Sequence, residues 1–346
     1  MKQLEYIKAC LNAPSQKIAL ITHHKPDADA LGSSLALFLF FKKLGHTTQV
    51  VIPSDYPNFL SWMPAIEFVQ IYNEQTAVEC EKTLLESDII FCLDFNDPKR
   101  VDALEQALIS SKTIKILIDH HLEPISFVDY SYQDSSAAAT CELVFEFIED
   151  LGYKNLIDVH IGECLYAGIM TDTGSFRFSS TTYKVHLIIA ELLKIGVDNS
   201  KIYRLIYDNN SENKLRLLGY SLHYKLEIYR EFNTALISLT ENELKQFNAQ
   251  TGDTEGLVNY ALSLEGIIFA ILLIEKDGVI KLSFRSSGDF SVRDFAFEHF
   301  EGGGHKNASG GKSYLTMEET KKKLLNLLPK YKNELLNTYL SNKNML

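Results

Sequence analysis

Short apolar runs alternate with amphipathic segments over the first half of the chain. Runs of strand length, rich in β-branched residues, lie at 18–22, 48–52, 89–93 and 114–118. Apolar residues recur at helical spacing at 32–44, 101–110, 136–149 and 159–170. Strands that alternate with helices favour parallel pairing with helices on both faces. The pattern therefore predicts an α/β fold with a doubly wound, mostly parallel sheet, and Asp134 or Ser135 as the cap of the helix at 136–149.

The pattern changes after Thr182, where helical spacing continues to about Leu222. Strand-like runs return from Tyr224 onward and are followed by a helical stretch, the glycine-rich sequence EGGGHKNASGG and a helical tail with a break expected near Pro329. We therefore expect a catalytic domain at 1–190, a helical connector at 191–223 and a smaller α/β domain at 224–346.

Composition and cysteine usage indicate the broad class of protein. Hydrophobic residues make up 46% of the 346 residues, which is enough for a core in each of two domains. The five cysteines are scattered and include no C-x-x-C pair, as is typical of reduced cysteines in a cytosolic protein. The N-terminus lacks the features of a signal peptide, and we find no apolar run that could span a bilayer. We expect a cytoplasmic protein that does not engage a membrane.

The net charge of −11 argues against a protein that tracks long nucleic acid. Such proteins usually carry a basic balance, because neutralising phosphates drives their affinity. If the substrate is phosphorylated, positive charge must be supplied locally, by metal ions or by a few well-placed side chains.

Acidic residues and histidines cluster where three predicted strands and one long apolar helix end. The clusters are His23, Asp27 and Asp29; Asp94; Asp119, His120 and His121; and Asp172. One such cluster alone would be explained equally well by a strand-to-turn signal. Ligands of open parallel sheets gather at the carboxyl ends of strands, near the point where strand order reverses, so we expect the clusters to converge there.

These eight residues offer three imidazoles and five carboxylates, without a nearby thiolate. The set is too rich for one catalytic zinc ion, which takes three protein ligands. It suits a pair of hard divalent cations, Mn²⁺ first and Mg²⁺ as the alternative. Two such ions that share a carboxylate are an arrangement used for in-line attack on phosphorus.

Four segments resemble, in order, the four motifs of the DHH phosphoesterase superfamily: HHKPDAD, LDFND, IDHH and TDTGSF. The sequence FRSSGDFSVRDFAFEHFEGGGHKNASGG resembles the glycine-rich end of a DHHA1 substrate domain. The two-domain layout is most similar to the nanoRNase/pAp phosphatase branch. That resemblance implies an enzyme that cleaves short oligonucleotides to mononucleotides and dephosphorylates 3′-phosphoadenosine 5′-phosphate (pAp).

The resemblance also implies roles for single residues. His23 and Asp27 would hold one ion, Asp29, His120 and Asp172 would hold the other, and Asp94 would bridge them. Asp119 would orient His120 or lie behind the ligands. His121 would contact the scissile phosphate or help to protonate the leaving oxygen. His24 is the additional histidine of the first motif and is interpreted as a neighbour of the site.

The C-terminal domain offers a second phosphate site. Glycines let a backbone approach an anion closely, and successive N–H groups can form a concavity that binds it. Arg285 can hold a phosphate through two parallel hydrogen bonds. We expect substrate to be bound by Arg285, Gly302, Gly303, Gly304 and His305.

Other functions share parts of this pattern. A phosphodiesterase of cyclic or linear dinucleotide messengers (c-di-AMP or pApA) would use the same chemistry. A RecJ-like single-strand exonuclease is disfavoured by the acidic balance, and an inorganic pyrophosphatase by the glycine-rich second domain. A non-catalytic nucleotide sensor is disfavoured because every ligand position is filled. The sequence leaves the oligomeric state open, including a homodimer formed through the N-terminal domain.

Overall fold

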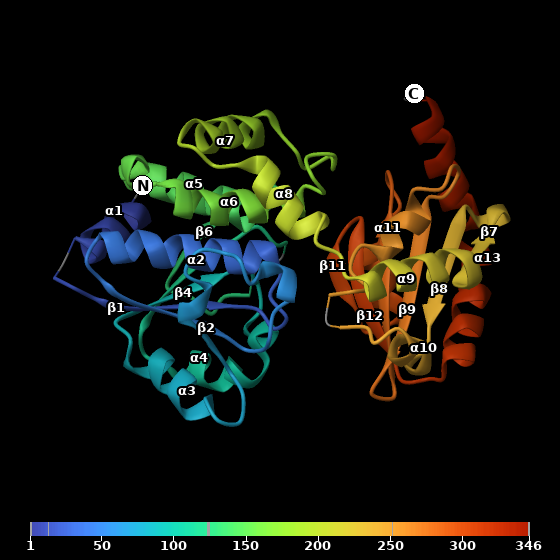
Figure 1. Ribbon diagram of the computed structural model, residues 1–346, viewed down its shortest axis with the longest axis horizontal. Helices are drawn as coiled ribbons and strands as arrows, with labels where there is room; N and C mark the ends of the chain where they lie inside the picture. The colour runs from blue at the N-terminus through green and yellow to red at the C-terminus, as the bar shows by residue number, and fades with distance from the viewer. Residues whose placement is uncertain (1, 13, 123–124, 251, 345–346) are drawn as a thin grey trace. The chain divides into compact units, whose positions relative to one another are not determined.

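The computed structural model describes residues 2–12, 14–122, 125–250 and 252–344. It divides the chain into two compact units, residues 1–209 and 210–346, and each is described by itself (Figure 1). The segment predicted as a connector contributes to both units. It contains α8 (Asn199–Tyr207) of the first unit and α9 (Glu212–Tyr220) of the second.

The first unit contains a six-stranded sheet in the order β3-β2-β1-β4-β5-β6, in which every pair of neighbours is parallel. Its strands are β1 (Lys17–Thr22), β2 (Thr47–Ile52), β3 (Val69–Ile71), β4 (Ile89–Leu93), β5 (Ile114–Asp119) and β6 (Tyr130–Gln133). The predicted doubly wound parallel sheet is confirmed. The short outer strands β3 and β6 were not predicted, because they contain no continuous apolar run.

Helices cover both faces of this sheet, as Figure 1 shows. One face packs against α2 (Ala28–Lys43) and α5 (Thr140–Asp150), on which α6 (Val159–Asp172) packs in turn, and the other face packs against α3 (Ala77–Glu86) and α4 (Glu105–Ser110). The remaining helices of the unit are α1 (Lys2–Leu11), α7 (Tyr183–Lys194), η1 (Asn58–Leu60), η2 (Ile66–Phe68), η3 (Pro98–Leu104) and η4 (Lys154–Leu156). Among the described residues, no helix has both the length and the apolar composition needed to cross a membrane.

Helices α2 and α6 pack closely because each carries a glycine at their contact. A Cβ atom added to Gly32 would lie 2.5 Å from the carbonyl oxygen of Cys164. A Cβ added to Gly168 would collide with Sγ of Cys141 and lie 2.8 Å from Oδ1 of Asp29. The two glycines therefore set the spacing of the helices that carry Asp29 and the C-terminal end of α6.

The second unit is a mixed sheet in the order β11-β12-β10-β9-β8-β7, in which only β8 and β9 pair in parallel. The strands are β7 (Leu226–Tyr229), β8 (Thr234–Leu239), β9 (Phe269–Lys276), β10 (Val279–Ser286), β11 (Gly303–His305) and β12 (Ala308–Ser313). The helices are α10 (Glu241–Gln246), α11 (Leu257–Leu262), α12 (Val292–His299), α13 (Met317–Asn344), the π-helical turn η5 (Ser221–Lys225) and η6 (Arg230–Phe232). The predicted smaller α/β unit is confirmed.

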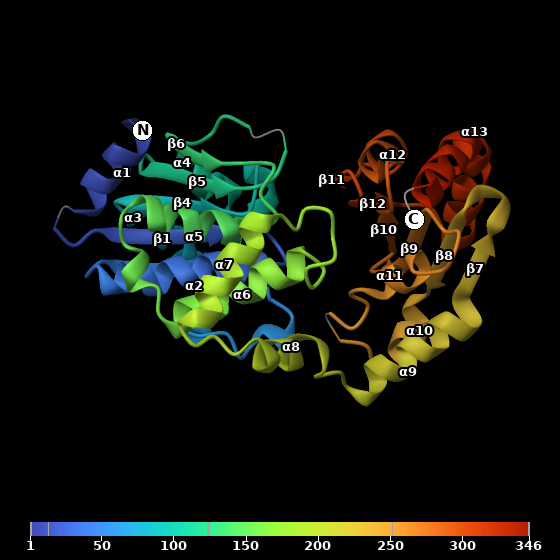
Figure 2. The same ribbon diagram turned by 90° about the horizontal axis from the view of Figure 1, so that it is seen from above.

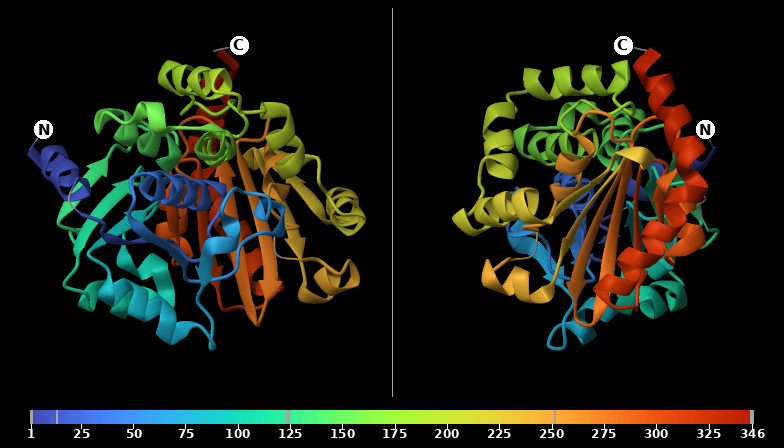
Figure 3. Two further views of the ribbon diagram at one scale, coloured as in Figure 1. Left: turned by 60° about the vertical axis from the view of Figure 1, so that its left-hand side comes forward. Right: turned by 90° about the vertical axis from the view of Figure 1, so that its right-hand side faces the viewer.

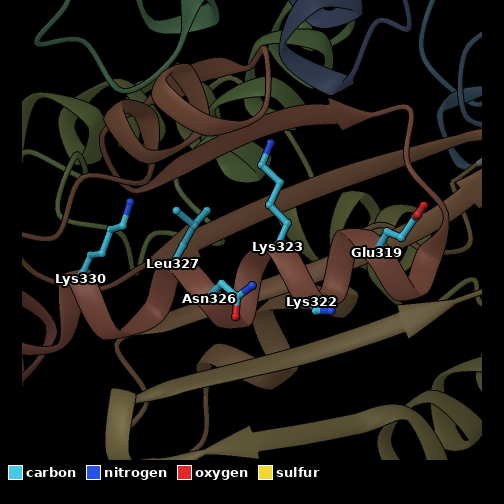
Figure 4. A pocket seen from close by; sticks show the side chains of 6 residues that line it. All are labelled: Glu319, Lys322, Lys323, Asn326, Leu327 and Lys330. Atoms are coloured by element: carbon cyan, nitrogen blue, oxygen red, sulfur yellow. The ribbon is translucent and has the colours of Figure 1, made fainter.

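Helix α13 packs against one face of this sheet (Figure 3). It continues through Pro329, so the predicted break at that residue is wrong. Its buried leucines, including Leu324, Leu328 and Leu335, bury enough apolar surface to offset the lost hydrogen bond. Figure 4 shows a shallow hollow on the surface of α13. All of its lining residues, among them Lys322 and Lys330, belong to α13, so no second element closes it.

Candidate metal centre and phosphate-binding face

The sequence clusters converge at the carboxyl edge of the first sheet. Thr22 of β1 pairs with Leu93 of β4, and Leu93 pairs with Ile118 of β5. The residues that follow in each strand, among them His23 and Asp94, therefore emerge next to one another. The order of strands reverses between β1 and β4, which is the place expected for a site in an open α/β sheet.

The predicted ligands form two groups in which the ligand atoms lie within 4.8 Å of one another: His23, Asp27 and Asp94; and Asp29, His120 and Asp172. Asp94 is close to both groups. Its Oδ2 lies 3.4 Å from Nε2 of His23, and its Oδ1 lies 3.5 Å from Nε2 of His120. The structure thus brings the six candidate ligands together, with Asp94 near both groups.

Backbone carbonyls orient both imidazoles. Nδ1 of His23 lies 2.9 Å from the carbonyl oxygen of His24, and Nδ1 of His120 lies 3.2 Å from that of Ala137. When Nδ1 donates its proton to a carbonyl, Nε2 presents a lone pair. In each ring Nε2 faces carboxylates, as a metal ligand should.

Asp29 also holds the start of helix α5. Its two carboxylate oxygens accept hydrogen bonds from the backbone N–H groups of Thr140 (2.6 Å) and Cys141 (2.8 Å). The hydroxyl of Thr140 donates to Oδ1 of Asp94 at 2.8 Å, so one residue links two ligand carboxylates. The predicted start of this helix at 136 with Asp134 or Ser135 as cap is wrong. Asp134 instead accepts hydrogen bonds from Ser136 in a local turn.

Two further ligands are fixed by the backbone. Asp27 is the N-cap of α2, and its Oδ1 accepts from the N–H groups of Asp29 and Ala30 at 3.0 and 3.1 Å. Asp94 has a φ of 65°, a left-handed conformation that costs energy in a residue other than glycine. Its N–H donates to the carbonyl oxygen of Ile118 at 3.1 Å, which holds the turn directly after β4.

The two ligand groups contain more carboxylates than imidazoles, so negative charge is in excess. Burial, followed by the charge of Asp94, raises the pKa of Asp29 to about 7. Burial alone would also raise the pKa of Asp94, but its hydrogen bond to His23 and the charges of the nearby imidazoles hold that pKa well below the ordinary value. Burial opposes charge on His23 and His120, yet the surrounding carboxylates raise both pKa values.

The imidazoles thus supply the positive charge that these carboxylates require. A site of oxygen and imidazole donors with excess negative charge fits hard divalent cations. One carboxylate oxygen of the neighbouring Asp119, Oδ2, is buried and has no hydrogen-bond partner among the described residues. An unsatisfied buried oxygen of this kind is itself an indication of an ion or water at the site.

Asp119 and His121 form a second row beside the ligands. Oδ1 of Asp119 lies 2.7 Å from Nδ1 of His121, so Asp119 orients this ring and not that of His120. Nη1 of Arg100 lies 2.8 Å from Nε2 of the same ring. Sequence reasoning missed Arg100. A signal was present, because Arg100 is the only arginine among the first 176 residues and follows Asp94 by six positions.

His24 lies outside both ligand groups. Its Nδ1 is 3.3 Å from Oδ2 of Asp102, and both side chains are partly exposed. Its backbone N–H donates to the carbonyl oxygen of Arg100 at 2.7 Å. His24 therefore helps to hold the segment that carries Arg100.

In the second unit, the register of three strands places Arg285 and His305 on one face. Arg285 of β10 pairs with Ala308 of β12, and Ala308 pairs with His305 of β11. Residues that oppose each other directly in antiparallel strands point to the same side. Phe284, the neighbour of Arg285, is buried on the other side. The neighbouring pair on the same face is Gly310 and Gly303. Neither residue has a side chain, so there is space beside Arg285 and His305.

The glycine-rich segment includes an edge strand, β11. Gly302 and Gly304 are required by packing, because a Cβ at either position would overlap the backbone of β12. At Gly303, by contrast, no described atom lies within 4 Å of an added Cβ. An edge strand leaves the N–H and C=O groups of its outer side unpaired within the sheet, so it can still offer donors to an anion.

Two family models match the chain: the DHH family, N-terminal domain, at residues 17–169, and the DHHA1 domain at residues 233–334. The bifunctional oligoribonuclease and PAP phosphatase NrnA of Thermus thermophilus is 31% identical over 89% of this chain and 88% of its own length. The solved structure of an exopolyphosphatase-related protein from Bacteroides fragilis has 40% identity and a TM-score of 0.92, and the match covers 96% of this chain and 97% of that one.

A third relative is the cyclic-di-AMP phosphodiesterase PdeA of Listeria monocytogenes, which is 25% identical over 92% of this chain but only 48% of its own length. These comparisons confirm the resemblance that the sequence motifs indicated. The chain belongs to the DHH family, with a DHH N-terminal domain in its first unit and a DHHA1 domain in its second.

Proposed function

We propose that this chain hydrolyses phosphate esters of short nucleotides, converting dinucleotides to mononucleotides and removing a phosphate from pAp. The observation that carries the proposal is the pair of ligand groups with Asp94 close to both. The relative from Thermus thermophilus, which matches over most of both chains, is named as an oligoribonuclease and PAP phosphatase.

His23 and Asp27 would hold one divalent cation, Asp29, His120 and Asp172 would hold the other, and Asp94 would contact both. Mn²⁺ is the first choice and Mg²⁺ the alternative, since both accept oxygen and imidazole ligands. Bound divalent cations supply charge stabilisation of the phosphoryl group and lower the pKa of water. Thr140 keeps Asp94 in place, and the start of α5 keeps Asp29 in place.

Arg100 would meet the scissile phosphate, with His121 bound to its guanidinium and Asp119 bound to the other side of the His121 ring. A guanidinium has only donors, so Nε2 of His121 accepts from Arg100 and the ring proton lies on Nδ1, toward Asp119. Both ring nitrogens of His121 are then occupied, so the ring would hold Arg100 in place and would not protonate the leaving oxygen, and the phosphate contact falls to the remaining donors of Arg100. Arg285 and His305, with the open position at Gly303, would bind the remote phosphate of the substrate.

A second candidate is a phosphodiesterase of dinucleotide messengers, which the similarity to the Listeria relative favours. The chemistry at phosphorus would be the same, and the difference lies in which dinucleotide is preferred. The chain spans about half of that relative, so the similarity concerns only the matching part.

The test is a comparison of kcat/KM on pAp, a 5′-phosphorylated dinucleotide, cyclic di-AMP, a long oligonucleotide and pyrophosphate, with Mn²⁺ or Mg²⁺ at one salt concentration. We expect the first two substrates to be preferred, and Asp94→Asn to lower kcat by at least about 100-fold, because an amide bridges two cations poorly. A preference for the long strand or for pyrophosphate would overturn the proposal.

A further inference from the structure

A pocket of about 420 Å³ lies in the first unit between the end of α6, the turn that follows it and α8. Figure 2 shows α8 beside α6. Its walls include Tyr166 and Met170 of α6, Phe176 of the turn, and Tyr203 and Arg204 of α8. The volume lies within the range of roughly 300–1,000 Å³ that is usual for small-ligand sites. The site proposed above does not use these residues.

The pocket adjoins the candidate metal centre. Met170 and Ser175, which line it, lie two residues before and three residues after Asp172. The ring of Tyr203 lies 5.0 Å from that of Tyr207. Burial raises the pKa of Tyr207 to about 12, and the neighbouring Tyr203 and Asp172 add to the increase. The segment around Asp172 therefore contributes both a candidate ligand and part of the pocket lining.

One wall is formed by a strained turn. Gly174, Ser175 and Phe176 have φ values of 57°, 61° and 66°, so three successive residues are left-handed and two of them carry side chains. The turn is fixed because the N–H of Ser175 donates to the carbonyl oxygen of Met170 at 2.7 Å, and that of Phe176 to Oγ1 of the buried Thr173 at 3.1 Å. Such strain persists where the surrounding structure imposes it, and it concentrates at functional sites.

The turn directs Phe176 into the wall of the pocket, where its ring meets that of Tyr166 edge to face with centroids 5.9 Å apart. Across the pocket, Tyr203 is 42% exposed, so much of its ring is accessible. The polar side chains that line the pocket include both hydrogen-bond donors and acceptors. Asn199 and Arg204 offer donors, whereas Asp208 offers only acceptors. Apolar and aromatic walls with both signs of charge fit a flat heteroaromatic group better than a phosphate.

We infer that this pocket binds one nucleobase of the substrate, by stacking on Tyr203 and by hydrogen bonds to Asn199 and Arg204. The inference rests on the proposed function, because it assigns the pocket to the nucleoside next to the phosphate that is hydrolysed. Every base has a π face, so stacking would anchor a nucleotide without selecting strongly among bases. Binding the base in this pocket would position the phosphate for attack.

The experiment compares Tyr203→Ala with Tyr183→Ala, the matched control, which removes a 73% exposed tyrosine from α7 of the same unit. The substrates are a 5′-phosphorylated dinucleotide, the two dinucleotides that lack either the 5′ or the 3′ base, and bis(p-nitrophenyl) phosphate, which has no base. We expect Tyr203→Ala to lower kcat/KM on the complete dinucleotide by about tenfold or more. The loss should be absent on bis(p-nitrophenyl) phosphate and on one of the two abasic dinucleotides.

Tyr203→Phe should retain stacking and activity, whereas Tyr203→Leu should behave like the alanine variant. Binding without turnover is followed with a dinucleotide that has a non-hydrolysable phosphonate linkage and a terminal 2-aminopurine. Its fluorescence should be quenched by the wild type and not by Tyr203→Ala.

The two proposals fail in different ways. A wild-type protein that hydrolyses none of the nucleotides would refute the proposed function itself. An active wild type with Tyr203→Ala and Tyr183→Ala equal on every substrate would leave that function intact and overturn the nucleobase pocket. Equal losses on the complete dinucleotide and on bis(p-nitrophenyl) phosphate would also overturn it, because they would show an effect on the metal centre.

Discussion

Arg100 donates a hydrogen bond to Nε2 of His121 across 2.8 Å, while Asp119 binds the opposite nitrogen of the same ring. Because the guanidinium is permanently charged, this row fixes one positive charge beside the carboxylates of the candidate metal centre. The arrangement explains how a chain with a net charge of −11 could receive a phosphate there.

Arg100→Ala should lower kcat/KM on pAp by about 100-fold, because removing a preorganised donor from the transferred phosphoryl group costs that order of rate. Arg100→Lys should restore only part of the loss, since an ammonium lacks the planar fork. Metal content, measured by atomic emission, should stay unchanged. Lys99→Ala, which removes the exposed neighbouring cation, is the control. An Arg100→Ala variant with normal kcat/KM would exclude Arg100 from the reaction.

Gly303→Ala separates packing from substrate binding in the second unit. The position has room for a Cβ and a φ that other residues adopt, so thermal stability should not change. If the substrate approaches the backbone here, the added methyl group should raise KM for pAp severalfold. Gly302→Ala, whose Cβ would overlap β12, should instead lower the melting temperature. Unchanged KM and stability in Gly303→Ala would show that nothing approaches this strand closely.

Gly168→Ala tests the helix spacing on which the ligands depend. The new methyl group would press on Cys141 and on Asp29, so α2 and α6 must separate. We expect unfolding to become easier by about 1–3 kcal/mol, as for other overpacked contacts. The affinity for Mn²⁺ in calorimetric titration should also fall, because Asp29 moves relative to the end of α6. Gly219→Ala, where an added Cβ meets no described atom within 4 Å, is the control. A stable variant with unaltered metal affinity would contradict the role of this glycine.

Removal of metal should make stability depend on pH. The folded-state pKa of Asp29 is raised to about 7 from an ordinary value of 3.8. Its protonated form therefore stabilises the metal-free protein below pH 4, and this contribution is lost as pH rises through 7. The raised pKa values of His23 and His120 act in the same direction.

The melting temperature of chelator-treated protein should accordingly fall between about pH 5 and pH 8, and added Mn²⁺ should cancel the loss. Asp29→Asn should show a weaker pH dependence in the metal-free state. Thermal melts across this range, with and without metal, measure the effect. A metal-free protein whose stability rises with pH would refute the charge imbalance.

The place where the candidate ligands gather could be predicted from sequence because topology determines it. Apolar runs predicted β1, β4 and β5, and parallel order alone brings the residues after those strands to one edge. The start of α5 could not be predicted in this way. Local residues such as Asp134 supply a plausible cap, but the N–H groups of the helix are taken by Asp29, which lies 111 residues from Thr140 in the sequence.

Other differences have similar causes. Arg100 follows a turn that ordinary signals already explain, and its isolation among the first 176 residues gives no role until the fold brings it to His121. Glycines at 302–304 suggest a loop, yet residues 303–305 pair with β12 and form the strand β11. Pro329 would end an isolated helix, but the packing of α13 against its sheet sustains it.

The ligand carboxylates differ in what else they do for the protein. Asp27 caps α2, and Asp29 binds the first N–H groups of α5, so both would be needed for folding even if catalysis were lost. If a duplicated gene lost its enzymatic role, the protein would tolerate substitutions of Asp172 or His120 before it tolerated substitutions of these two aspartates. In a diverged relative, the first motif would therefore indicate only common ancestry. The later motifs would indicate whether the protein is still an active enzyme.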